Sequence, residues 1–177
     1  MSRTDAVCVM ALVVCAAVLV AVGVLVAAQA APAVQGPTYT DPAYGFAIRG
    51  PAFPKTDQGN VIPVMMFGPA DGGFANNVNV VVQNVTTTRD AYRKLTLDQM
   101  KAAGYKVISD KDATVSGKDA VMMSFEGVQQ GRNLQFLSLS VIDAGRVFVV
   151  TCTATKEAYA AIEKEFLACV GSFALAK

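Results

Sequence analysis

Hydrophobic and polar positions alternate along much of the chain with the period of two that is typical of β-strands. The clearest case is residues 76–85, where valines occupy one face of the predicted strand and Asn77, Asn79 and Gln83 occupy the other. Such a strand buries one side and leaves polar groups on the other. The same period predicts further strands near Tyr39 and over residues 44–48, 61–67, 105–109, 113–115, 120–126, 133–143 and 146–154.

Two segments change to the period of an α-helix. The first, residues 87–103, begins with Thr87 and Asp90, which resemble a capping box, and Gly104 ends it. The second, residues 155–171, begins with Thr155 as its cap. The apolar stripe of the first consists of Tyr92, Leu95, Met100 and Ala103, and that of the second consists of Tyr159, Ile162, Phe166, Cys169 and Val170.

The order of these elements indicates the fold class. Short turns such as Ser116-Gly117-Lys118 and Ala144-Gly145 join consecutive predicted strands, so these strands pair antiparallel. Each amphipathic helix has to cover its apolar stripe against the sheet. Residues 49–60 and 68–73 are predicted to be loops, because they are rich in Pro and Gly. We therefore predict an α+β domain in which an antiparallel β-sheet is flanked by helices.

The N-terminal segment predicts export. Residues 6–28 carry no charged side chain and are long enough, as a helix, to cross a hydrocarbon core of ~30 Å. Residues 1–30 are therefore either a signal peptide cleaved after Ala30 or a transmembrane anchor that is retained. Both alternatives place the domain in the periplasm or at the cell surface, secreted or anchored. Residues 31–37 are predicted to be a linker and residues 38–177 the folded domain.

Several short motifs occur in a defined order along this domain. They are the run Tyr39-Thr40-Asp41-Pro42-Ala43-Tyr44-Gly45-Phe46-Ala47-Ile48, then Gly50-Pro51, Asn77-Val78-Asn79-Val80, Gly117-Lys118-Asp119-Ala120, the strand at 146–151 and the closing Ser172-Phe173. Together they resemble the PsbP-like superfamily, which includes Mog-type, PsbP and DcrB-like proteins. The resemblance implies an α-β-α sandwich, usually without enzymatic activity. It also implies a bacterial-type envelope member of unassigned function.

Composition and charge exclude several classes of function. The chain has 177 residues, with 15 Lys and Arg against 14 Asp and Glu, a balance that does not suit binding to nucleic acid. Because it contains no histidine, imidazole zinc sites and Ser-His-Asp or Cys-His catalysis are excluded. The metal-binding histidines of some plant PsbP proteins likewise have no counterpart. We expect no catalytic residue, no metal and no cofactor.

Two functions from different classes are compatible with these observations. The preferred one is a non-catalytic accessory or binding module of the cell envelope, with an envelope protein or a small ligand as its partner. If residues 6–28 are retained, the membrane is a further partner. The alternative is a carboxylate-dependent, hydrolase-like enzyme that uses its acids and the loop at 49–60. Asp110 and Asp112 flank Lys111 in a predicted connection and are expected at the solvated surface, which favours the binding module.

Two groups of side chains are candidates for a special role. The first is the polar side of the predicted strands, made by Asn77, Asn79, Gln83, Ser138 and Ser140. These residues either present amides and hydroxyls to a ligand or are wetted or covered by a helix. The second is Cys152 and Cys169, the cysteines beyond the leader, on the last predicted strand and the last predicted helix. They form either a disulfide or a pair of buried thiols.

Overall fold

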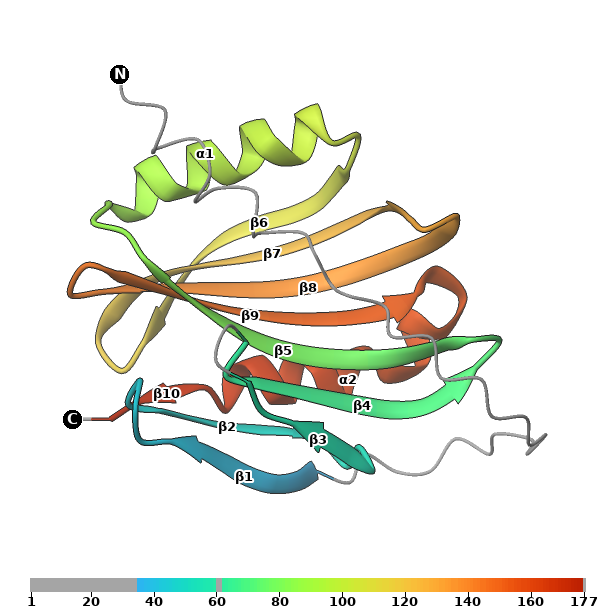
Figure 1. Cartoon of the computed structure of the whole chain (residues 1–177). Helices are drawn as coiled ribbons and strands as arrows, with labels where there is room; N and C mark the ends of the chain where they lie inside the picture. The colour runs from blue at the N-terminus through green and yellow to red at the C-terminus, as the bar shows by residue number, and fades with distance from the viewer. Residues whose placement is uncertain (1–34, 60–61, 177) are drawn as a thin grey trace.

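The computed structural model describes residues 35–59 and 62–176 (Figure 1). It confirms an α+β class with antiparallel sheet and two helices. Along the chain the elements are β1 (Gln35–Asp41), β2 (Phe46–Pro51), β3 (Lys55–Asp57), β4 (Val64–Asp71), β5 (Phe74–Asn84), α1 (Arg89–Ala102), β6 (Lys106–Val115), β7 (Lys118–Gln129), β8 (Arg132–Asp143), β9 (Arg146–Thr155), α2 (Lys156–Gly171) and β10 (Ala174–Leu175).

Seven strands form one antiparallel sheet in the order β3-β4-β5-β9-β8-β7-β6, which we call the large sheet. The sheet consists of two runs of consecutive strands, β3 to β5 and β6 to β9. The runs meet where β5 pairs with β9, from Asn77 opposite Thr153 to Asn84 opposite Arg146. The connection that contains α1 therefore carries the chain from the centre of the sheet to its edge at β6 (Figure 1). At the β6–β7 turn, Ser116 and Gly117 have φ of 51° and 76°, the left-handed conformation of a tight hairpin turn.

The remaining strands form a small sheet in the order β1-β2-β10, which periodicity does not predict as a separate unit. The turn between β1 and β2 is closed by Asp41, whose carboxylate accepts hydrogen bonds of 2.9 Å from the backbone N–H of Ala43 and of Tyr44. A turn at this position agrees with the sequence prediction. The small sheet contacts α2 through β2, where the Arg49 N–H donates to Ser172 Oγ at 2.8 Å.

Strand boundaries differ from the sequence prediction in several places. The predicted loops at 49–60 and 68–73 contain strand residues, namely β3 and the ends of β2 and β4. The two strands predicted at 105–109 and 113–115 are one strand, β6. Both β4 and β6 contain a register shift in their pairing. In β4 the shift lies between Phe67 and Ala70, where the predicted strand ended, and it lets the strand continue past residues that interrupt its alternation. In β6 the predicted break at residues 110–112 pairs regularly with β7, but three consecutive charged side chains hid the strand from the sequence pattern.

The helices are close to their predicted positions. Thr88, rather than Thr87, caps α1, because its hydroxyl accepts a hydrogen bond from the Ala91 N–H at 3.2 Å. Thr155 caps α2 as predicted and accepts from the Ala158 N–H at 3.3 Å. The buried side of α1 has a spacing of four and consists of Tyr92, Thr96 and Met100, so the predicted Leu95 and Ala103 are exposed instead. The buried side of α2 consists of Tyr159, Phe166, Cys169 and Val170, and Ile162 is half-buried.

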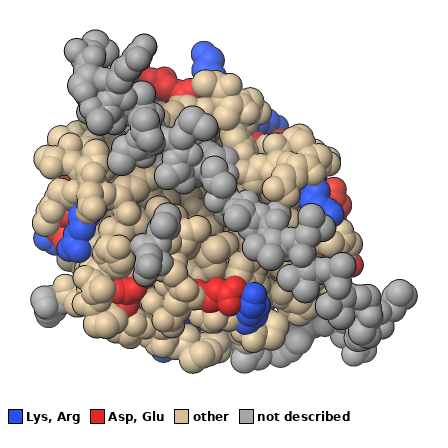
Figure 2. Space-filling model, viewed as in Figure 1, with Lys and Arg blue, Asp and Glu red and all other residues tan. Residues whose placement is uncertain are grey.

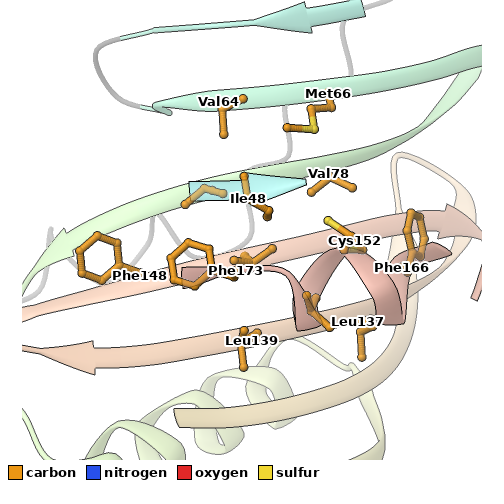
Figure 3. Close-up of a cluster of buried hydrophobic side chains, with 14 of the residues drawn as sticks. Ile48, Val64, Met66, Val78, Leu137, Leu139, Phe148, Cys152, Phe166 and Phe173 are labelled. Carbon is orange, nitrogen blue, oxygen red and sulfur yellow. The ribbon is translucent and has the colours of Figure 1, made fainter. Parts of the chain in front are cut away.

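Hydrophobic side chains pack on both faces of the large sheet. On one face, residues of β5, β8 and β9 join α2 and the small sheet in the main core (Figure 3). On the other face, Met100 of α1 packs with a cluster on β7 and β8, and Tyr92 packs with Val147 and Val149 of β9. Because successive residues of a strand point to opposite faces, Phe148 belongs to the main core while its neighbours on either side face α1.

The predicted leader, residues 1–30, lies outside the described residues, as do residues 31–34 of the predicted linker. The last residues of that linker, from Gln35 onward, are the beginning of β1. Within residues 35–59 and 62–176, neither helix is long and apolar enough to span a membrane.

Phe173 links the small sheet to the large one, and its removal tests this packing. Its ring centroid lies 5.6 Å from that of Phe46 in β2 and 6.0 Å from that of Phe148 in β9. We expect Phe173→Ala to lower the free energy of unfolding in urea by about 3–4 kcal/mol, because it leaves a buried cavity. The control Val128→Ala truncates a side chain that is 65% exposed and should change it by no more than about 0.5 kcal/mol. Equal effects would contradict the packing.

Candidate functional site

The predicted polar side chains lie on the face of the large sheet that also carries α1. The valines at alternate positions of β5 belong to the main core beneath α2, so the polar residues between them point the other way. Leu137 and Leu139 of β8 belong to the same core, which places Ser138 and Ser140 on the α1 face as well. The structure therefore puts all of the predicted residues on one face: Asn77, Asn79, Gln83, Ser138 and Ser140.

Backbone pairing brings polar residues of three adjacent strands side by side. Asn79 of β5 lies opposite Thr151 of β9, and Thr151 lies opposite Ser138 of β8. Two residues along each strand, on the same face, Asn77 of β5 lies opposite Thr153 of β9. We call these five residues the polar patch. Thr151 is half-buried and the other four are buried, so the patch is a buried part of the sheet rather than a solvated surface.

Gln83 and Ser140, which belong to the same face, lie under α1 instead. The Tyr92 hydroxyl donates a hydrogen bond to Gln83 Oε1 at 3.1 Å. Burial raises the pKa of Tyr92, although side-chain hydrogen bonds with Ser140, Thr96 and Gln83 act in the opposite direction. These contacts hold the N-terminal half of α1 on the sheet. The structure thus divides the predicted set into patch residues and residues that position the helix.

Thr153 is the least satisfied residue of the polar patch. Its side chain is 0% exposed, and its hydroxyl has no hydrogen-bond partner among the described residues. An unpaired buried hydroxyl destabilises a fold by about 1–3 kcal/mol. Its cross-strand neighbour Asn77 is held in place, because Asn77 Nδ2 donates to the Ala75 carbonyl at 3.1 Å. The patch therefore contains a fixed amide beside a hydroxyl that can still form a hydrogen bond.

Apolar side chains border the polar patch. Half-buried Met65 and Phe67 of β4 lie opposite its two asparagines. On the other side, Phe136 of β8 lies opposite Thr153. None of the patch residues is charged, and in Figure 2 the described surface on the viewed side is mostly uncharged. The charged Lys55 lies outside the patch, with its Nζ 5.3 Å from the centroid of the Phe67 ring. This environment suits a neutral ligand that has hydrogen-bonding groups.

Ion pairs hold α1 beside this site. Arg93 of α1 contacts Asp110 at 2.9 Å and Asp112 at 2.6 Å, and Arg89 contacts Asp112 at 3.4 Å. Both aspartates lie in β6 rather than in the predicted connection between two short strands. They are therefore engaged in positioning the helix, which was not foreseen from the sequence.

Cys152 and Cys169 are not part of the polar patch. Both belong to the main core beneath α2, on the opposite face of the large sheet, and both are free thiols in the structure. The sequence prediction that they lie on β9 and α2 with their buried sides together agrees with this placement.

No protein-family model and no curated protein matches this sequence. Solved structures are similar to it. The cyanobacterial PsbP of Synechocystis sp. PCC 6803 has a TM-score of 0.57 and 12% identity, over 78% of this chain and 91% of that chain. LpqN of Mycobacterium tuberculosis, described as involved in cell envelope biogenesis, has a TM-score of 0.55 and 12% identity, over 83% and 87%. The chain has a PsbP-like fold. A Bacteroides thetaiotaomicron protein, of which this chain covers 50%, is similar with a TM-score of 0.55.

This fold agrees with the fold that the resemblance read from the motifs implies. The strand pairing brings into the polar patch two residues that the sequence reading missed, Thr151 and Thr153. Both lie in the run that follows Arg146, where Val147, Val149, Thr151 and Thr153 share one face of the strand. The signal was present in that alternation, but the neighbouring valines made the segment appear uniformly apolar.

The unpaired hydroxyl of Thr153 allows a test of the site in the absence of any ligand. Thr153→Val keeps the shape of the side chain and removes the unsatisfied group, so we expect the free energy of unfolding to rise by about 1 kcal/mol. The same substitution two residues along, Thr155→Val, removes the α2 cap and should lower it by about 1 kcal/mol. Urea unfolding measures both. A loss of stability in Thr153→Val would show that the hydroxyl has a partner within the protein.

The raised pKa of Tyr92 predicts a pH dependence with a definite sign. Because the pKa in the folded state lies above the ordinary value of 10.0, the contribution to stability is fully present below pH 10 and is lost as the pH rises above it. We expect Tyr92→Phe to be less stable than the wild type at pH 9, since Gln83 loses its donor. Between pH 9 and pH 11, Tyr92→Phe should lose less stability than the wild type loses, because it has no phenol to ionise. Urea unfolding at both pH values measures this, and parallel losses would contradict burial of the phenol.

Proposed function

We propose that this protein is a non-catalytic, exported or membrane-tethered accessory module of the cell envelope. It binds a small, neutral ligand with hydroxyl or amide groups on the polar patch. The observation that carries the proposal is the buried, unpaired hydroxyl of Thr153 among neutral hydrogen-bonding side chains. A fold retains such a group at a cost to stability, which is common where a function depends on it.

The make-up of the polar patch supports a small ligand. Amide and hydroxyl groups on rigid neighbouring strands fix the orientation of a ligand, and the apolar border contributes contact area. Met65, Phe67 and Phe136 supply that border on two sides of the patch. The absence of charge from the patch residues favours a neutral partner over an anionic or cationic one, because an unpaired ligand charge would have to be desolvated.

Two observations support a location of the protein in the cell envelope. The uncharged stretch at 6–28 predicts export or anchoring, and LpqN, which has a similar fold, is described as involved in cell envelope biogenesis. The polar patch lies on the face of the large sheet where α1 packs, so a ligand bound there need not displace the main core beneath α2.

The positions of the acids favour binding over hydrolysis. Asp110 and Asp112 are paired with Arg93, and Asp41 closes the β1–β2 turn. In the predicted loop at 49–60, Asp57 is paired with Lys55 at 2.8 Å. These carboxylates are engaged in structure, and none of them belongs to the polar patch.

Native mass spectrometry of the full chain, extracted from the envelope of its source cells, tests this proposal. We expect the wild type to retain a neutral small molecule, and Thr153→Val to retain about ten-fold less, because one hydrogen bond to the ligand is lost. Thr38→Val changes the same residue type on β1, away from the patch, and should retain as much as the wild type.

Two results would overturn the proposed function. If the wild-type protein carries no small molecule directly after extraction, the proposal that it binds a ligand is wrong. Equal retention by the wild type, Thr153→Val and Thr38→Val would show that a ligand binds elsewhere. The stability of Thr153→Val, measured separately, ensures that reduced retention is not a consequence of unfolding.

A further inference from the structure

The two described cysteines meet inside the main core. Cys152 comes from the middle of β9 and Cys169 from the last turn of α2, and both are 0% exposed. They belong to one cluster of buried residues, which also contains Phe166 of the same helix. Figure 3 shows Cys152 on its strand beside the helix that carries Phe166. α2 packs directly on β8 and β9, so the helix and the strand are already neighbours.

The two thiols also interact with each other. Burial raises the pKa of the Cys152 thiol, and the neighbouring Cys169 thiol raises it further. A buried thiol with a raised pKa is protonated at neutral pH and is a poor nucleophile. The pair therefore does not suit catalysis of thiol exchange. It has the position and the burial of a structural cross-link.

We infer that Cys152 and Cys169 form a structural disulfide in the exported protein. The two thiols lose two protons and two electrons, and an S–S bond forms between their sulfur atoms. The oxidant is a disulfide of a thiol-oxidising protein or of oxidised glutathione, which is reduced to two thiols in the same exchange. The inference rests on the exported location in the proposed function, because disulfides persist in oxidising compartments.

The burial of the pair determines when this bond forms. In the folded protein neither sulfur is accessible to an oxidant, and thiol exchange requires access to an attacking thiolate. Oxidation therefore precedes the docking of α2 on the sheet. Once the helix has docked, the bridge is shielded from reductants in the same way. It then fixes the C-terminal end of α2, beside β10 of the small sheet, to the centre of the large sheet.

Peptide mapping of the full chain from its source cells tests the bridge. The protein is unfolded without reductant, alkylated, digested and analysed by mass spectrometry. We expect the peptides that contain Cys152 and Cys169 to be linked and unalkylated until a reductant is added. Complete alkylation of both cysteines before reduction, in protein recovered from the envelope, would overturn the inference.

A refolding arm separates this inference from the proposed location. The full chain, unfolded and reduced, is refolded in a buffer of reduced and oxidised glutathione. Formation of the 152–169 link supports the inference even if cell fractionation places the protein in the cytosol, a result that would contradict the proposed function. Refolded protein whose two thiols stay reduced would overturn the inference, whatever the location.

Thermal unfolding gives a second readout with a matched control. A bridge that closes a loop of this length should raise the midpoint by roughly 10 °C, so reductant should lower the midpoint of the wild type by about that amount. The double variant with Cys152→Ala and Cys169→Ala should show no response to reductant. Equal midpoints of the wild type with and without reductant, at complete reduction, would contradict the cross-link.

Discussion

The alternation of side chains along β8 and β9 is the constraint on which the rest of the structure depends. These strands lie inside the large sheet, with α2 on one face and α1 on the other. Phe148 and Val150 pack in the main core, while Val149 and Thr151 point to the α1 side. A shift of one residue in the pairing would exchange the two sets and place hydroxyls beneath α2. The register of these strands therefore fixes both cores and the polar patch together.

The same constraint explains where the candidate site lies. α1 packs on β6 and β7, and its Tyr92 reaches the end of β9 near Val147. The centre of the face, at Asn79, Thr151 and Ser138, adds amides and hydroxyls instead of extending the apolar clusters. This polar character is the feature on which the proposed binding function rests.

Much of the fold follows from the sequence because the long elements are strongly periodic. β5, β8, β9 and α2 agree with the prediction nearly to the residue, since each alternates or repeats over many positions. β3 and β10 are too short to show a period, and pairing with neighbours decides that they are strands. Two consecutive threonines could each cap α1, and only the tertiary structure distinguishes Thr88 from Thr87.

The candidate site is less predictable for a related reason. The polar side of β5 is visible in the sequence, but which strands lie beside it depends on the β5–β9 pairing across more than sixty residues of chain. That pairing brings Thr151 and Thr153 to the asparagines and assigns Gln83 to α1. Asp110 and Asp112 are exposed, as the sequence predicts, but their ion pairs with Arg93 depend on the packing of α1 beside β6, which the sequence does not show.

A crystal structure of the protein extracted from its native envelope tests the central claim most directly. The account predicts electron density for a bound small molecule over β5, β9 and β8, with one of its polar atoms within hydrogen-bond distance of Thr153 Oγ1. A map in which the Thr153 hydroxyl is bonded to a group of the protein itself, with no foreign density on that face of the sheet, would contradict it.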